Sequence, residues 1–174
     1  VLVDDLTIEQ FVYDTTADGS PAAGATATGL DAHIIGGQRD VAVNLLIKGT
    51  GSSGSGAEII GGQADLFNGP ADEGEILLQW DGPDQDIALV PTGLGGVDFT
   101  DGGISYALAS DIIFSDQGGL FQVAVYTTAT QYSIVTATTP SVVADPLPAF
   151  ITDEQFRDPG FTSDFIVSVE CGTG

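Results

Sequence analysis

The segment that most constrains the fold is an apolar run that ends at an Asp-Gly turn. It covers residues 75–82, with the sequence EILLQWDG, and contains the only tryptophan of the chain. An apolar run of this length that stops at Asp-Gly is typical of a buried strand followed by a tight turn. We therefore predict that this segment is the central strand of a β-sandwich, with Trp80 buried in the core.

Short segments of β-type sequence recur along the whole chain, separated by turns rich in glycine and proline. Residues 41–47 place Val41, Val43, Leu45 and Ile47 in alternation, which is typical of a strand with one buried face. The further expected elements are one or two strands in residues 1–13, a long loop at 14–29, and strands at 104–109, 111–115, 120–127, 132–138, 150–151 and 165–169. No long segment has the 3.6-residue period of an amphipathic helix. The chain is therefore predicted to be all-β, a single β-sandwich or jelly-roll domain over residues 1–174 with long Gly/Ser/Thr/Asp-rich loops.

One heptapeptide occurs twice, as IIGGQRD at residues 34–40 and as IIGGQAD at residues 59–65. We interpret the two copies as corners where a strand meets a turn, with the glycine pairs supplying positive φ angles. A loop that holds a ligand with its backbone is the alternative. Phosphate binding by such a loop would require a helix directly after the glycine pair, and no helix is predicted after either pair.

The balance of charge excludes several classes of partner. The 174 residues include 25 Asp and Glu against 3 Lys and Arg, a formal net charge of −22. This charge repels nucleic acid and anionic lipid, so we expect neither as a partner, and it favours bound or screening cations. No apolar run approaches the ~20 residues of a membrane span, so membrane insertion is not expected.

The sequence lacks methionine, including at position 1, and has one cysteine, Cys171. We take the missing methionine to indicate a processed protein, with removal of a signal peptide as the simplest account. The expected location is therefore secreted, either extracellular or at the cell surface. Cys171 is expected to be a small buried hydrophobe near the last strand; a bridge between two molecules is the alternative.

No group of residues in the sequence indicates catalysis. His33 is the only histidine, so the second imidazole that a zinc site would use is missing. A Ser-His-Asp triad would have to use His33, which lies in no nucleophile-elbow pattern. Paired carboxylates, which a glycosidase needs, are so abundant that no pair stands out. We therefore predict that the protein is not an enzyme.

Three short motifs resemble those of a known family. They are DDL at residues 4–6, IGGQRD at 35–40, and LQWDG at 78–82 followed by GLGGVD at 93–98. They resemble a group of secreted bacterial β-sandwich domains that often end in a Pro-Glu-Pro type sorting tail for surface anchoring. The resemblance implies a fold similar to the galactose-binding-like jelly rolls of some carbohydrate-binding modules. Leu6 stands where that family has an aromatic residue.

The acidic turn after the central strand is the first candidate metal site. Asp81, Asp84 and Asp86 surround a Gly-Pro turn and can converge on one hard cation. Calcium, which takes six to eight oxygen ligands, is the cofactor that such a site would hold. The alternative is a solvated acidic turn without an ion.

Asp4, Asp5 and Asp164 form a second candidate metal site, on the condition that the first and last strands are neighbours as in the similar jelly rolls. Arg39 is one of the few cations of the chain. We expect its guanidinium to be paired, partly buried and bracing two loops, with anion recognition as the alternative.

Functions of different classes fit these features. We predict a non-catalytic structural protein, a subunit of an extracellular filament, sheath or matrix that associates with itself or with another envelope protein. The apolar start Val1-Leu2-Val3 can add as a strand to another subunit's sheet, or residues 1–8 can pair within their own domain. The alternatives are a carbohydrate-binding module with a polysaccharide ligand, marked by exposed tyrosines on one sheet face, and an accessory subunit of a larger cell-envelope complex.

Overall fold

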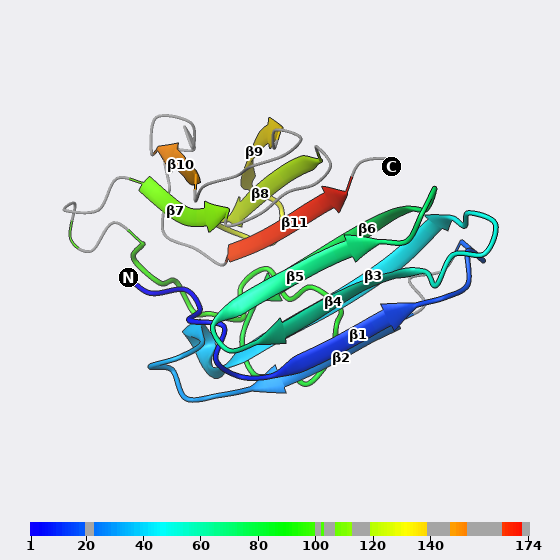
Figure 1. Cartoon of the computed structure of the whole chain (residues 1–174). Coiled ribbons are helices and arrows are strands. Elements are labelled where there is room, and N and C mark those ends of the chain that lie inside the picture. The colour runs from blue at the N-terminus through cyan, green and yellow to red at the C-terminus, as the bar shows by residue number, and fades with distance from the viewer. Residues whose placement is uncertain are drawn as a thin grey trace.

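The computed structural model is all-β, as predicted, and its described strands form three antiparallel sheets (Figure 1). The structure describes residues 1–19, 23–99, 102, 107–112, 119–138, 147–152 and 165–171. The largest sheet has six strands in the order β2 (Ala23–Thr28), β3 (Gln38–Ile47), β6 (Glu73–Trp80), β11 (Phe165–Cys171), β8 (Leu120–Tyr126) and β9 (Tyr132–Thr138). The three-stranded sheet has the order β1 (Gln10–Asp14), β4 (Ser55–Ile60) and β5 (Gln63–Asn68). The two-stranded sheet pairs β10 (Leu147–Thr152) with β7 (Ala107–Ile112).

Strand β6 lies inside the six-stranded sheet, between β3 and β11, as predicted for a central strand. Because side chains alternate along a strand, Ile76, Leu78 and Trp80 are buried on the same face. Trp80 is 5% exposed, and its indole Nε1 donates a 2.8 Å hydrogen bond to Asp4 Oδ2. The predicted place of Trp80 in the core is therefore confirmed.

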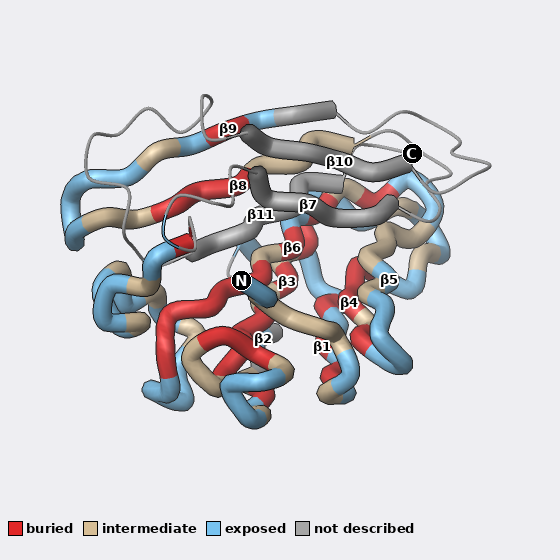
Figure 2. The backbone as a smooth tube through the Cα atoms, turned by 90° about the vertical axis from the view of Figure 1, so that its left-hand side faces the viewer, coloured by how far each residue is buried: buried red, intermediate tan, exposed pale blue. Residues whose placement is uncertain are grey.

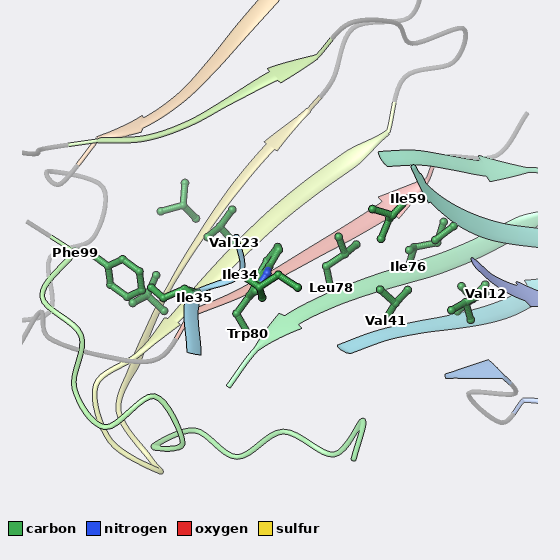
Figure 3. Close-up of a cluster of buried hydrophobic side chains, with 14 residues drawn as sticks. Val12, Ile34, Ile35, Val41, Ile59, Ile76, Leu78, Trp80, Phe99 and Val123 are labelled. Carbon is green, nitrogen blue, oxygen red and sulfur yellow. The ribbon is translucent and has the colours of Figure 1, made fainter. Parts of the chain in front are cut away.

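The apolar core lies where the three-stranded sheet covers one face of the six-stranded sheet (Figure 3). The large sheet supplies a row of β-branched and aliphatic side chains, and the small sheet supplies the facing row. Buried members include Val41, Val43, Ile76, Leu78, Val123 and Val125 from the large sheet, and Val12, Ala57 and Ile59 from the small one. Figure 2 shows buried residues along β3, β6 and β8. Side chains of both sheets therefore belong to one core, while the β-sandwich and its jelly-roll connectivity stay predictions.

The first and last strands are not neighbours in this structure. β1 pairs with β4 of the small sheet, whereas β11 lies between β6 and β8 of the large sheet. The condition for a joint site of Asp4, Asp5 and Asp164 is therefore not met, and Asp164 lies outside the described residues. Strand neighbours depend on which apolar faces close over the core, and local sequence patterns do not report this.

The prediction of a loop over residues 14–29 is wrong in part, because residues 23–28 form β2. This strand, AGATAT, pairs antiparallel with β3 at the edge of the six-stranded sheet. Alanine and glycine have low β-propensity, so the hydrogen-bonding edge of β3 determines the conformation rather than the local sequence. The two strands predicted at residues 104–109 and 111–115 correspond to one strand, β7, with residues 104–106 and 113–115 outside the described part of the chain.

Both glycine pairs of the repeated heptapeptide have positive φ, as predicted. Gly61 and Gly62, with φ of 63° and 83°, form the two-residue turn of the β4–β5 hairpin. Gly36 and Gly37, with φ of 70° and 76°, lie in the short 3-10 turn η1 (Ile35–Gly37) that leads into β3. These backbone angles are ones that glycine adopts without steric cost.

The N-terminal segment is bound to its own domain from Val3 onward. Val3 O accepts a 2.7 Å hydrogen bond from Ile35 N, and Asp4 forms an antiparallel bridge with Ile34. Val1 and Leu2 are 57% and 55% exposed, and their addition to another subunit stays a prediction. In the described part of the chain, no helix has the length and apolar character needed to cross a membrane.

Candidate metal centre

Three aspartates gather where the chain leaves β6. Asp81 directly follows that strand, Asp84 lies in the turn after it, and Asp40 lies on the neighbouring strand β3. One carboxylate oxygen from each lies within 4.8 Å of the other two. Asp40 and Asp81 are 0% and 1% exposed, whereas Asp84 is exposed. The group therefore has a buried end and an end open to solvent.

The alternation of β3 explains why Asp40 faces this turn. Arg39 and Val41 point into the core, so Gln38 and Asp40 point to the opposite face of the six-stranded sheet. Asp40 lies directly across from Gln79 of β6 in the strand register. Asp40 is therefore delivered to the C-terminal end of β6, where Asp81 begins the turn.

The turn after β6 folds back over this face and is held there by glutamine side chains. Gln38 Nε2 donates to Asp40 Oδ1 at 2.9 Å and to Asp84 Oδ1 at 3.0 Å. Gln38 Oε1 accepts a 3.0 Å hydrogen bond from Gln85 N, and Gln79 Nε2 donates to Ile87 O at 2.8 Å. Gln38 thus links two of the three carboxylates and fixes their orientation.

Two buried carboxylate oxygens in the group have no hydrogen-bond donor among the described residues. They are Asp40 Oδ2 and Asp81 Oδ1. The other oxygen of each is occupied, since Asp40 Oδ1 accepts from Gln38 and Asp81 Oδ2 accepts from Val90 N at 2.6 Å. A buried acceptor without a donor costs about 1–3 kcal/mol, so this pair of oxygens calls for a proton or a cation.

The acidity of the pair reflects the same arrangement. Burial raises the pKa of Asp40 to about 7. The neighbouring Asp81 adds to this, because its carboxylate accepts a hydrogen bond from Asp40 when Asp40 is protonated and because its negative charge opposes ionisation of Asp40. Burial also raises the pKa of Asp81, and the charge of Asp84 raises the pKa of both groups. Like charges in a buried site oppose ionisation unless a cation compensates them.

Two of the three residues predicted to form a site at this turn belong to the observed cluster. Asp81 and Asp84 come together, but Asp86 lies outside the cluster and its Oδ1 accepts from Ala88 N at 3.1 Å. Asp40 takes the third place, and sequence reasoning missed it. The sequence feature that could have indicated Asp40 is the pair of polar residues Gln38 and Asp40 on the outward face of a strand. That Asp40 lies near Asp81 follows only from the register between β3 and β6.

The second predicted group does not form a cluster among the described residues. Asp4 is bound by Arg39 Nη1 at 3.1 and 2.9 Å and by Trp80 Nε1, so donors already surround its carboxylate. Asp5 instead contacts His33 Nδ1 at 2.5 Å. Hydrogen bonds from Thr7 and then from His33 lower the pKa of Asp5 to about 2.

Arg39 is paired, as predicted, but it is fully rather than partly buried, and it braces the N-terminal segment. Its Nε donates to Gln10 Oε1 at 2.8 Å and its Nη2 to Ile8 O at 2.5 Å, in addition to the pair with Asp4. The guanidinium is 0% exposed. Its donors are thus occupied by the chain's own acceptors, and its role here is structural.

Comparisons of the chain with models of protein families, with curated protein sequences and with solved structures gave no match. The resemblance to secreted β-sandwich domains with a sorting tail therefore stays a prediction.

Proposed function

We propose that this protein is a non-catalytic structural protein of the extracellular space, a subunit of a filament, sheath or matrix whose fold is stabilised by calcium. The observation that carries the calcium part of the proposal is the pair of buried oxygens Asp40 Oδ2 and Asp81 Oδ1, which have no donor among the described residues, beside Asp84. A divalent cation placed among these carboxylates satisfies both oxygens and removes the repulsion between the buried charges.

The donor set favours calcium over the other common protein cations. It consists of carboxylate oxygens, which suit hard cations, without the nitrogen and sulfur donors that zinc prefers. Calcium tolerates irregular geometry and completes its shell with carbonyl oxygens and water, and the exposure of Asp84 gives water access to this group. Magnesium requires a near-ideal octahedron and gives up water reluctantly.

A bound cation in this place has a structural consequence. It joins Asp40 of β3 to Asp81 and Asp84 of the turn, and so fastens the segment that covers one end of the six-stranded sheet. Stabilisation by an abundant extracellular cation suits a protein with a net charge of −22, because cations also relieve its self-repulsion.

Calcium titration of the metal-free protein tests the proposal. Protein stripped with EDTA and desalted is titrated with calcium chloride by calorimetry, and its thermal midpoint is compared with that in sodium chloride of equal ionic strength. We expect saturable binding and a higher midpoint in calcium, about 2.7 kcal/mol of stabilisation at a free concentration of 100 Kd. Equal midpoints in the two salts together with no binding heat would overturn the proposal.

Matched variants locate the binding. Asp40→Asn and Asp81→Asn remove a buried ligand, so we expect both to abolish the calcium-specific shift. Asp86→Asn removes one charge from the same turn but lies outside the cluster, so it should retain the shift. A calcium effect that survives both buried substitutions places the ion elsewhere.

A second candidate function, carbohydrate binding, is favoured by an aromatic strip on the outer face of the small sheet. Phe11 and Tyr13 of β1 are each 47% exposed, and the rings of Tyr13 and Phe67 lie 6.0 Å apart across Gly56. The Tyr13 hydroxyl donates to Glu58, which leaves a polar group beside the rings. Retention on insoluble polysaccharides, lost in Tyr13→Ala but kept in Tyr132→Ala, would support this function; no retention would remove it.

A further inference from the structure

We propose that two copies of this chain associate edge to edge through strand β9, so that their six-stranded sheets join into one continuous sheet. The inference deepens the proposed structural role and rests on it, because it names the surface by which such a subunit assembles. Three observations carry it: the position of β9, its exposed apolar side chains and the absence of charged residues from the sequence segment that contains it.

β9 is the last strand of the six-stranded sheet (Figure 2). Within the described residues it pairs only with β8, in a regular register from Tyr126↔Tyr132 to Leu120↔Thr138. No described strand therefore pairs with the N–H and C=O groups on its other side. Such an edge is a template for pairing with another strand.

The side chains along this edge are apolar and exposed. Tyr132 is 51% exposed and Ile134 is 45% exposed. The ring of Tyr132 lies against Tyr126 of β8, with ring centroids 5.0 Å apart, so it is held at the surface in a defined position. A cross-strand aromatic pair of this kind stabilises the β8–β9 hairpin.

Charge distinguishes this edge from most of the molecule. Charged residues make up 16% of the chain, yet residues 117–144, which include β8 and β9, contain none. Two copies with a net charge of −22 each repel one another, so contact is least costly where both surfaces are neutral. Natural edge strands are usually protected by charges or proline, and residues 132–138 contain neither.

Two other edges, β5 and β2, are less suited to a second copy. β5 carries Asp65 and lies next to Glu58 of β4, so two such edges would bring carboxylates together. β2 is uncharged, but its described exposed residues are Gly24 and Thr28, which offer no apolar side chain. Of these three edges, β9 is therefore the one best suited to pair with its own copy.

An antiparallel pair of identical strands has a two-fold axis, so only registers symmetric about that axis are possible. We place the axis at Ile134, an exposed apolar residue near the middle of β9. An axis at Ile134 places that residue beside its own copy and sets Tyr132 opposite Thr136 of the second copy. Such an isologous contact closes on itself and yields a dimer rather than an open chain of subunits. A filament or sheath would then grow from the dimer through a different surface.

The test compares assembly of the intact protein with that of two charged variants. Sedimentation equilibrium is run in calcium at low salt and in about 1 M sodium chloride, where the Debye length is roughly 3 Å. We expect a monomer–dimer equilibrium that strengthens at least tenfold with salt. Ile134→Lys should weaken dimerisation at least tenfold. Ile60→Lys, at a site 48% exposed on the β4–β5 hairpin, should leave it unchanged.

A cysteine variant tests the proposed β9–β9 register even if Ile134→Lys does not fold. In a Cys171→Ser background, Ile134→Cys should form a disulfide-linked dimer on exposure to oxidised glutathione, whereas Ile60→Cys should not. A monomeric intact protein at high concentration and salt, or a dimer unaffected by Ile134→Lys, overturns the inference. Calorimetry on the same samples distinguishes failure of this inference from failure of the calcium proposal. A monomer that binds calcium contradicts only the edge contact. A dimer that binds no calcium contradicts only the calcium proposal.

Discussion

Asp4 and Arg39 form an ion pair that the protein encloses completely. The distance from Arg39 Nη1 to Asp4 Oδ2 is 2.9 Å. The side chain of Arg39 is 0% exposed and that of Asp4 is 3% exposed. The same Asp4 oxygen accepts from Trp80 Nε1 at 2.8 Å. One carboxylate from the N-terminal segment therefore joins β3 and β6 on the core face, opposite to the face that carries Asp40.

Removal of the Asp4 carboxylate should destabilise the protein strongly. Asp4→Ala leaves the Arg39 charge buried without its partner, which costs about 3–5 kcal/mol. Asp5→Ala is the matched control, because Asp5 is adjacent in sequence but its partner His33 lies at the surface, with a side chain 42% exposed. Urea unfolding gives both values, and equal losses in the two variants would contradict the structural role of the Asp4–Arg39 pair.

Truncation of the central tryptophan should have an effect of similar size. Trp80→Ala removes a large core side chain and its hydrogen bond to Asp4, with an expected loss of about 3–5 kcal/mol. Phe11→Ala removes an aromatic residue that is 47% exposed and should cost much less. Thermal or urea unfolding measures the difference; an unchanged stability of Trp80→Ala would show that the strand is misplaced.

Close packing of the turn beside the metal centre predicts a selective effect at Gly93. A Cβ on Gly93 would lie 1.7 Å from Asp81 O, so Gly93→Ala must displace the backbone that carries a proposed ligand. Gly95→Ala meets no atom within 4 Å, and its φ of 71° adds only about 1–2 kcal/mol of strain. Both variants should lose stability, but Gly93→Ala alone should lose the calcium-specific shift of the thermal midpoint. Retention of that shift in Gly93→Ala would argue against a ligand role for Asp81.

The raised pKa of Asp40 predicts how stability depends on pH when no metal is bound. Its pKa is about 7 in the folded protein against 3.8 as its ordinary value, so the folded state holds more protons between these values. The contribution is fully present below pH 3.8 and is lost as the pH rises to about 7, so the free energy of unfolding falls across this window. In EDTA, Asp40→Asn should flatten this fall, whereas Asp86→Asn should leave its slope unchanged. The same slope in all three proteins would mean that general charge repulsion is its cause.

The strand content and the central place of β6 were predictable because they depend on local pattern. Alternating apolar residues produced the prediction for β3, and the run ending at Trp80 produced the one for β6. The tertiary structure corrected the prediction at β2, whose residues lack β-propensity and form a strand because β3 offers hydrogen bonds. It also decided that β11 lies between β6 and β8 rather than beside β1.

The candidate site was predictable only where its members are close in sequence. Asp81 and Asp84 belong to one turn, so their proximity follows from their short separation in the sequence. Asp40 joins them through the pairing of β3 with β6, and a shift of that register by one residue would turn Arg39 toward the turn instead. Sequence alone therefore determined the strand periodicity, the charge and the acidic turn, which are properties of neighbours along the chain. The tertiary structure decided which distant residues meet, because the register is set by burial of whole sheet faces.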